Sequence, residues 1–347
     1  MALQSIKNMG RTPYYKAIEL RDQLLKTSRV TLERPIFIWG TGRSGTHLLF
    51  DVLSLHPTLI FPRAKTRWKK GLWGSMHWGE NTPEQLKGRP IPEEGFQRFW
   101  IDAGLQFDFK GLLRRQDLDN RIASAIRERY ASTLYREWFW NGSLALRILD
   151  KTPIFVMMLD AVDAIFPDAY HIYCLRDPRA VLNSFLRNAR FPEKESSTAG
   201  IPETGFWSSL RPPGYEAYQS KPLAERLAWQ VQTLVEIGFA SREFLGDRLI
   251  CFKYEELLSD SHTSAEWLLQ RLDLAPFPGI RALIPPKFSD YSPPWPDADG
   301  RVAEPYGRIR CYRDDEIGQV TGLNDLAVQM GYDRYRVGVV TETSLVT

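Results

Sequence analysis

This sequence lacks the features of a disulfide-rich, membrane-spanning or secreted protein. Its 347 residues include only three cysteines, Cys174, Cys251 and Cys311, whose spacing fits neither a zinc site nor a CxxC redox motif. The longest clean apolar run, residues 154–159, has six residues, whereas about 20 are needed to cross a bilayer. The N-terminal residues contain no apolar core or cleavage site of a secretory signal. We therefore expect a soluble protein without a membrane span, most simply in the reducing cytoplasm.

A large charge of one sign is also missing. Lys and Arg number 45 and Asp and Glu 42, a net charge of +3, so no global charge favours nucleic acid as a partner. The content of 43% hydrophobic and 25% charged residues is ordinary for a globular chain and excludes a mainly disordered, collagenous or coiled-coil protein. The length allows two domains of about 150 residues each or one larger α/β domain. An anionic partner must therefore be bound by a local arrangement of residues.

Short apolar runs alternate with helical periodicity along most of the chain. Strands are expected at 35–39, 59–61, 144–149, 170–175 and 248–253, and helices at 14–28, 46–55, 118–138, 154–165, 177–187, 222–243 and 261–272. This alternation predicts an α/β fold with three layers and a mostly parallel central sheet. Two proline-rich segments, 190–222 and 276–305, interrupt the pattern, and we expect them to be lids or substrate-binding loops.

The loop at residues 40–47, Gly-Thr-Gly-Arg-Ser-Gly-Thr-His, follows a predicted strand and opens a predicted helix. Its glycines fit both the dinucleotide fingerprint and the Walker A frame, in which backbone N–H groups face an anion. The dinucleotide interpretation needs an acidic residue about 20 positions on, but residues 52–79 contain none. Thr46 stands where Walker A requires lysine. A loop with Arg43, Ser44 and Thr46 suits one phosphate or sulfate better than a Mg²⁺-bridged triphosphate, and a glycine turn without a ligand is the alternative.

A second anion-binding pattern begins where the 170–175 strand ends. Arg176 is followed by Asp177, a good N-cap, and by Pro178, which suits the first helical position. Ser184 lies two helical turns beyond Asp177, on the same face of the predicted helix. Arg176 and Ser184 could therefore grip one phosphate together. The alternative is that Arg176 pairs with Asp177 or another acid, and that Ser184 only packs as a small residue.

Together these motifs resemble the sulfotransferases that use 3′-phosphoadenosine-5′-phosphosulfate (PAPS), in particular the bacterial and Golgi-like branch of the P-loop sulfotransferases. The resemblance runs from about Pro35 to Tyr332 and includes residues 149–153 (Leu-Asp-Lys-Thr-Pro) and 251–257 (Cys-Phe-Lys-Tyr-Glu-Glu-Leu). It implies a sulfotransferase domain at 35–335, an N-terminal helical extension at 1–34 and a C-terminal tail at 336–347. The nucleotide-binding residues that it implies are Gly42, Arg43, Ser44, Gly45, Thr46 and His47 for the 5′-phosphosulfate, Arg176 and Ser184 for the 3′-phosphate, and in addition Tyr254, Arg308 and Arg310.

The resemblance also implies the reaction. The sulfuryl group of PAPS would pass by in-line displacement to a hydroxyl or amine of a small-molecule or glycan-like acceptor, and PAP (3′-phosphoadenosine-5′-phosphate) would be released with no metal. Arg43 stands at the position of the family's loop lysine, and Lys151 matches its second lysine. We expect both cations to stabilise the charge that grows on the bridging oxygen.

The general base is where the sequence departs from the family. Pro153 stands where the cytosolic branch has histidine, and residues 61–67 lack the glutamate of the Golgi-like branch. Asp150, His77 and His56 are the remaining candidates, and Asp150 ranks first because it adjoins Lys151.

Several alternatives remain open at this stage. The basic run at 63–70 would suit an acidic acceptor but is also compatible with a solvated face. His47 is a further departure, because the family often has threonine there. The alternatives for the function are a P-loop kinase or nucleotidase, and a non-catalytic module that binds nucleotide or sulfate. The sequence leaves the acceptor and the oligomeric state undetermined.

Overall fold

In this computed structural model, the described residues are 32–60, most of 115–134, 146–189, 212–288 and 321–332. Within these ranges, five strands form a sheet in the order β2-β3-β1-β4-β5, and every neighbouring pair is parallel. The strands are β1 (Ile36–Trp39), β2 (Leu59–Ile60), β3 (Arg147–Lys151), β4 (Tyr170–Leu175) and β5 (Leu249–Lys253).

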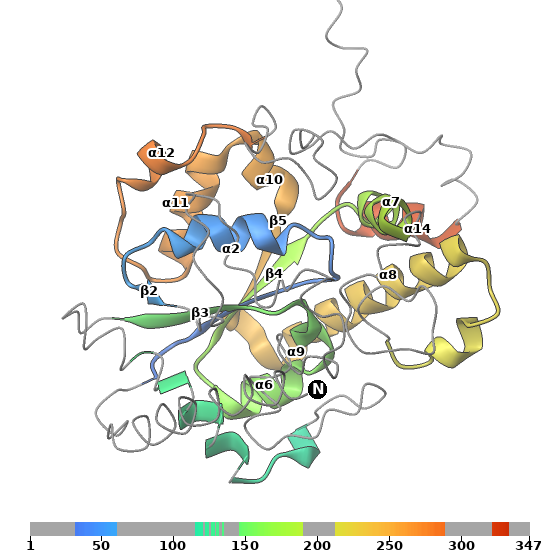
Figure 1. The fold of residues 1–347 in the computed structure, drawn as a ribbon, viewed down its shortest axis with the longest axis horizontal. Coiled ribbons are helices and arrows are strands. Elements are labelled where there is room, and N and C mark those ends of the chain that lie inside the picture. Colours follow the sequence, from blue (N-terminus) through green and yellow to red (C-terminus); the bar gives the residue numbers. More distant parts are fainter. Residues whose placement is uncertain are drawn as a thin grey trace, which may run out of the picture.

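Helices connect these strands and cover both faces of the sheet (Figure 1). The described α-helices are α2 (Thr46–Ser54), α6 (Leu159–Ile165), α7 (Pro178–Ala189), α8 (Leu223–Ala240), α9 (Arg242–Leu245), α10 (Tyr254–Ser259), α11 (Ser261–Arg271), α12 (Ile280–Leu283) and α14 (Thr321–Gln329). Short 3₁₀ helices are η2 (Arg115–Asp117), η3 (Pro153–Met157), η4 (Tyr215–Tyr218) and η5 (Gly246–Arg248). Residues 120–134 are helical wherever they are described.

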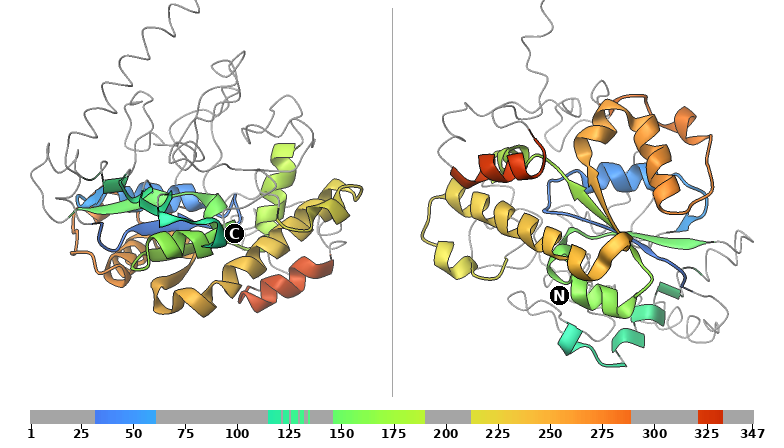
Figure 2. Two further views of the ribbon diagram at one scale, coloured as in Figure 1. Left: turned by 90° about the horizontal axis from the view of Figure 1, so that it is seen from below. Right: turned by 180° about the vertical axis from the view of Figure 1, so that it is seen from behind.

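The side chains of each strand alternate between two hydrophobic cores, one on each face of the sheet. In β1, Ile36 and Ile38 lie in the core formed with α2, α10, α11 and α12, whereas Phe37 and Trp39 lie in the core formed with α6, α7 and α8. Figure 1 and the turned views of Figure 2 show these two groups of helices on opposite sides of the sheet. A parallel sheet is covered on both faces in this way. The predicted three-layer α/β fold is confirmed.

Strand β3, the segment 153–165 and helix α10 differ from the sequence-based expectation. Strand β3 begins and ends later than predicted, so that Asp150 and Lys151 belong to the strand and pair with Phe37 and Ile38 of β1. The helix expected at 154–165 divides into η3 and α6, because Met158 between them has a φ of −139° and a ψ of 26°, which do not continue a helix. Helix α10 was not predicted, since it follows β5 directly and is only six residues long.

Other predictions lie outside the described residues and stay predictions. They are the helix at 14–28, the basic run at 63–70, the C-terminal tail, and those parts of the two proline-rich segments that span 190–211 and 289–305. The described parts of these segments contain η4 and α12. The domain boundaries also stay predictions.

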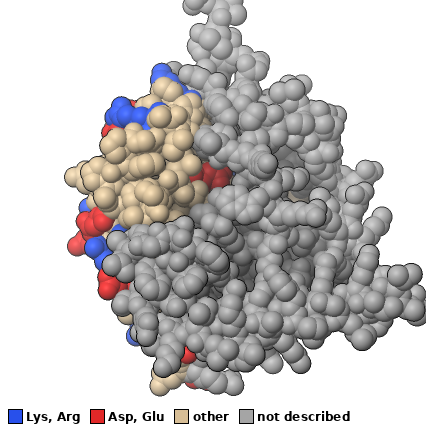
Figure 3. Space-filling model, turned by 60° about the vertical axis from the view of Figure 1, so that its left-hand side comes forward, with Lys and Arg blue, Asp and Glu red and all other residues tan. Residues whose placement is uncertain are grey.

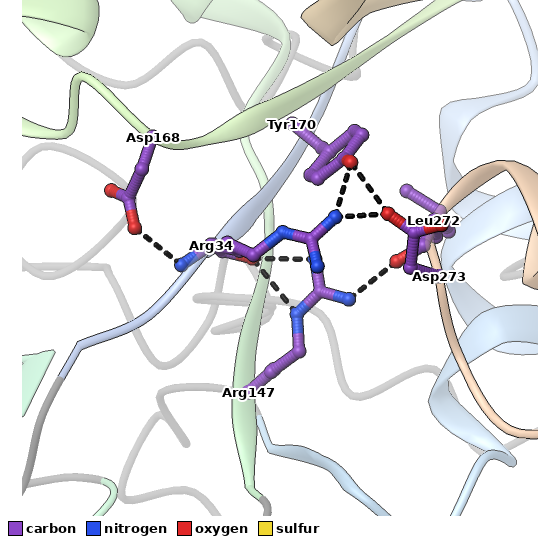
Figure 4. Close-up of polar contacts among 6 residues, drawn as sticks. All are labelled: Arg34, Arg147, Asp168, Tyr170, Leu272 and Asp273. Atoms are coloured by element: carbon purple, nitrogen blue, oxygen red, sulfur yellow. Dashed lines mark hydrogen bonds and ion pairs between the residues drawn. The ribbon is translucent and has the colours of Figure 1, made fainter.

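The amino-terminal edge of the sheet is closed by a cluster around two arginines (Figure 4). Arg147, at the start of β3, donates from Nε and Nη2 to the carbonyl of Arg34 at 2.9 and 2.6 Å, and from Nη1 to the carbonyl of Leu272. Arg34 donates to the hydroxyl of Tyr170, at the start of β4, and to the carboxylate of Asp273. Burial and the charge of Arg34 lower the pKa of Arg147 to about 10. The cluster therefore ties the starts of three strands to the end of α11.

The described part of the face in Figure 3 carries acidic and basic side chains in mixture, around a large uncharged area. An exposed ion pair joins α12 to α11, where Arg281 donates to Glu266 at 2.7 Å. In the part of the chain that the structure describes, no helix has the length and apolar character that crossing a bilayer demands.

Candidate functional site

Several of the predicted site residues lie at the carboxyl-terminal edge of the sheet, opposite the arginine cluster. The glycine loop follows β1, Lys151 ends β3, Arg176 follows β4 and Tyr254 follows β5. Because all four strands are parallel, their ends lie at the same edge, which is where open α/β sheets bind ligands.

The glycine loop turns tightly between β1 and α2. Gly45 has a φ of 91°, and a Cβ on it would lie 2.1 Å from the ring of Tyr254. A Cβ on Gly40 would lie 2.4 Å from Oγ of Ser44 and 2.7 Å from the carbonyl of Cys174. Arg43 has a φ of 55°, which is uncommon for a residue with a side chain. The glycines thus let the loop approach β4 and α10, and the N–H groups that open α2 remain available for an anion.

The two anion-binding motifs predicted from the sequence lie side by side. Arg176 donates from Nη1 to the carbonyl of Arg43 at 2.9 Å, and its guanidinium carbon lies 4.9 Å from the ring centre of Tyr254. The Nε of Arg43 donates to Oγ of Ser184 at 3.0 Å. Ser184 itself is only 4% exposed. The loop, the β4–α7 junction and α10 therefore present two guanidinium groups and a hydroxyl to one small region.

Two buried polar atoms in this region have no hydrogen-bond partner among the described residues: Oγ of Ser44 and Nε of Arg176. Buried polar atoms are nearly always paired in folded proteins. A hydroxyl and a guanidinium N–H in this state suit the oxygens of a phosphate or sulfate, and the residues present therefore fit an anionic ligand.

The remaining contacts around Arg176 fix the start of α7. The carboxylate of Asp177 accepts from the backbone N–H of Arg179 at 2.9 Å and from its guanidinium at 2.8 Å. Asp177 is thus an N-cap as predicted, and it pairs with Arg179 rather than with Arg176. Glu255 accepts from the backbone N–H of Asp177 at 3.0 Å and from the hydroxyl of Tyr332 at 2.9 Å. Burial raises the pKa of Glu255, against the nearby charge of Arg176.

Lys151 lies on the α2 side of the sheet. It is 2% exposed, and its Nζ lies 2.8 Å from Nε2 of His47, at the start of α2. Asp150 does not join this group, because alternate residues of a strand point to opposite faces. Its buried carboxylate accepts hydrogen bonds from Tyr130 and, at 3.1 Å, from Thr152 on the other face. Burial raises the pKa of Asp150. The geometry removes the reason for ranking Asp150 first as the base, which was that it adjoins Lys151.

Neither of the two histidine candidates for the base, His56 and His77, is placed at the site by the described structure. The ring of His56 is buried after the end of α2, hydrogen-bonded to the carbonyl of Ala275 at 3.0 Å and to Thr58 at 2.9 Å. It is therefore a structural residue away from the carboxyl-terminal edge. His77, Arg308 and Arg310 lie outside the described residues.

One ionisable residue of the site was missed in the sequence. Asp51 lies one helical turn after His47 on α2, and burial raises the pKa of its carboxyl to about 7, an effect that the charge of Lys151 opposes. The i, i+4 spacing from His47 could have indicated a shared helix face. Its burial could not be foreseen, because it depends on how α2 packs against β3.

The chain is thus a parallel α/β protein whose cationic and hydroxyl side chains gather at the edge where such folds bind ligands. A family model described as "Sulfotransferase family" matches residues 35–278. The chain therefore belongs to the sulfotransferase family.

Individual relatives are distant. Over 161 residues the chain is 26% identical to a Caenorhabditis briggsae protein named "Putative protein-tyrosine sulfotransferase", a match that spans 44% of this chain and 43% of that relative. It therefore aligns with less than half of that relative's length. Sulfotransferase STF9 from Mycobacterium avium has a similar structure, with a TM-score of 0.50 and 16% identity over 88% of this chain and 78% of that chain. Sulfotransferase STF1 from Mycobacterium tuberculosis has a TM-score of 0.42 and 16% identity over 75% and 73%. The likeness to STF9 concerns the fold.

Proposed function

We propose that the protein transfers the sulfuryl group of PAPS to a hydroxyl or amine of a small-molecule or glycan-like acceptor. The observation that carries this proposal is the convergence of Arg43, Ser44, Arg176 and Ser184 at one edge of the sheet, around two buried polar atoms that have no partner among the described residues. PAPS carries a phosphate at the 3′ position and a phosphosulfate at the 5′ position, and the site offers donors for both.

The two ends of the nucleotide would be bound by different parts of the site. The 5′-phosphosulfate would lie against the glycine loop and the first N–H groups of α2. Arg176 and Ser184 would bind the 3′-phosphate with charge-assisted and neutral hydrogen bonds. Arg43 contacts Ser184 through its Nε, so its guanidinium would lie between the phosphosulfate and the 3′-phosphate of the bound nucleotide.

Lys151 is the cation proposed to act in the chemical step. The acceptor oxygen or nitrogen attacks sulfur, the bond from sulfur to the bridging oxygen breaks, and PAP leaves with the electron pair of that bond. Negative charge grows on the bridging oxygen, where an ammonium in a water-poor position stabilises it most effectively. With an exposure of 2%, Lys151 is in such a position. No step of this scheme requires a metal.

The C. briggsae relative is named for tyrosine as its acceptor. A phenolic hydroxyl is one case of the acceptor class proposed here, and so phenols and tyrosine peptides belong in the acceptor panel. The share of that relative which is aligned is too small to narrow the class further.

The experiment is a thermal-shift comparison of PAP, NADPH and Mg-ATP on the full chain, with no metal added to PAP. PAP at about 100-fold excess over its Kd should stabilise the protein by about 2.7 kcal/mol. A melting temperature unmoved by PAP but raised by NADPH or Mg-ATP would refute the proposal. PAP binding without sulfated product across the acceptor panel would favour the non-catalytic module.

A further inference from the structure

A hydroxyl acceptor must lose its proton during the transfer, and the described site contains a cluster of ionisable side chains that could accept it. Three ionisable side chains gather where α2 faces the end of β3: His47, Asp51 and Lys151. His47 is exposed, whereas Lys151 beside it is buried. Since Lys151 is proposed to meet the transferring group, His47 lies next to the reacting atoms and is open to an acceptor.

The contact between Lys151 and His47 restricts the state of the imidazole. An ammonium has three donors and no acceptor, and it can hydrogen-bond to an imidazole nitrogen only if that nitrogen is unprotonated. The Asp51 carboxyl interacts favourably with the charge of Lys151, which helps to keep the lysine protonated. His47 would then be neutral, with its proton on Nδ1 and a lone pair on Nε2, the form that a base needs before the reaction.

We propose that His47 is the general base of the transfer, that Lys151 holds its imidazole in the accepting tautomer, and that Asp51 supplies the balancing charge. This inference rests on the proposed function. When the donor binds, the Lys151 ammonium turns to the bridging oxygen and leaves Nε2 open. The acceptor oxygen attacks sulfur and its proton passes to Nε2, while PAP departs with the electrons of the broken S–O bond. The imidazolium then returns the proton to water.

Asp51 has the position for a supporting role. It lies on the same face of α2 as His47, one turn farther from the glycine loop. Its carboxyl, with a pKa of about 7, can become charged when an imidazolium forms beside it. As a base it would be farther than His47 from the loop proposed to hold the sulfuryl group.

Nitrogen-15 NMR of the histidine rings in the full chain tests the contact without turnover. The chain has five histidines, and His47→Gln identifies the His47 signal by its loss. We expect the Nδ1–H tautomer in the wild type. In Lys151→Met the pKa of His47 should rise by about one unit or more, because a neighbouring positive charge disfavours imidazolium. A proton on Nε2, or a titration that Lys151→Met leaves unchanged, overturns the proposal.

The dependence of kcat on the acidity of the acceptor distinguishes a general base from a structural residue. With PAPS as donor, phenol must lose its proton during transfer, whereas an acidic nitrophenol is already ionised at neutral pH. His47→Gln should lower kcat for phenol about 100-fold or more and for the nitrophenol less than about tenfold.

Two other results of the phenol comparison would overturn the role of His47 as the base. Equal losses for the two phenols would make His47 a structural residue, and an acceptor-dependent loss in Asp51→Asn with His47→Gln unaffected would move the base to Asp51; both overturn the proposal. If the wild type sulfates neither phenol, the NMR measurement of the His47 tautomer and its titration in Lys151→Met is the test of the proposal. Failure of PAP to bind the wild type would refute the proposed function rather than the role of His47. The NMR measurement uses the free protein and therefore does not depend on PAP binding.

Discussion

At the scale of single residues, Arg43 joins the two halves of the proposed donor site. Its carbonyl accepts from Arg176 and its Nε donates to Ser184, so the glycine loop and the β4–α7 junction meet through one residue. Arginine has five donors in a planar fork and stays charged. The Nε of Arg43 holds Ser184, and a planar guanidinium fork matches the oxygens of a phosphate or sulfate. A lysine would present its three donors from a single nitrogen and would lack this planar fork.

Replacement of Arg176 or Ser184 by alanine should remove the preference of the protein for PAP over AMP, which lacks the 3′-phosphate. We expect PAP to bind roughly 10- to 100-fold more weakly to Arg176→Ala, and less than about tenfold more weakly to Ser184→Ala, because a charge-assisted bond contributes about twice as much. AMP affinity should change little. Isothermal titration calorimetry with both nucleotides measures this, and equal losses for PAP and AMP would place these residues elsewhere.

Asp51 makes stability depend on pH in a direction that can be worked out. Its pKa is about 7 in the folded protein and about 3.9 in an unfolded chain. Between these values the folded state binds more protons, so the free energy of unfolding falls as the pH rises from about 4 to about 7. Asp51→Asn cannot ionise, so its free energy of unfolding should not fall in this way as the pH rises. The variant should be more stable than the wild type by on the order of 2 kcal/mol at pH 8 and equal to it near pH 4. Urea unfolding at both pH values is the measurement, and a difference that stays constant with pH would contradict it.

At the scale of elements, the glycine loop depends on the position of α10. Gly45 and Gly246 both have a positive φ, 91° and 54°, and so an alanine is strained at either position. A Cβ on Gly45 would overlap the ring of Tyr254 at 2.1 Å, whereas a Cβ on Gly246 has nothing within 4 Å. Gly246, whose ψ of −130° differs from the 10° of Gly45, is therefore a control for an alanine at positive φ that meets no side chain.

Gly45→Ala should consequently reduce the rise in melting temperature that PAP produces, because the loop must move to relieve the overlap. Gly246→Ala should cost roughly 1–3 kcal/mol of stability through backbone strain and leave the PAP effect intact. Differential scanning fluorimetry of both variants, with and without PAP, gives the comparison. If both variants kept the full PAP effect, the loop would not need its contact with α10.

The main strands and helices, the glycine loop after β1 and the N-cap of α7 could be predicted from the sequence, because each depends on a local pattern. The orientation of Asp150 could not. It depends on where β3 ends, and the ladder with β1 continues through Asp150 and Lys151, which places neighbouring side chains on opposite faces. The contact of Arg43 with Ser184 joins residues 141 positions apart, and it arises from the strand order rather than from any local pattern.

At the scale of the whole molecule, the two edges of the sheet have different tasks. The carboxyl-terminal edge carries the glycine loop, Lys151 and Arg176, with two buried polar atoms that lack a partner among the described residues. At the amino-terminal edge, each of the three guanidinium nitrogens of Arg147 donates to a carbonyl, that of Arg34 or that of Leu272. A site that binds a ligand keeps hydrogen-bond donors available for it, whereas in a purely structural contact the buried donors are paired within the protein.

Arg147→Ala should therefore destabilise the protein without weakening its response to PAP. Loss of charged donors to two carbonyls should lower the free energy of unfolding by roughly 2–3 kcal/mol. The increment that PAP adds should stay the same, because it depends only on ligand concentration and Kd. Arg281→Ala is the control, since its exposed pair with Glu266 should contribute no more than about 1 kcal/mol. Chemical unfolding of both variants with and without PAP measures the two quantities separately. An Arg147→Ala protein of normal stability that no longer responded to PAP would mean that the amino-terminal edge takes part in binding the nucleotide.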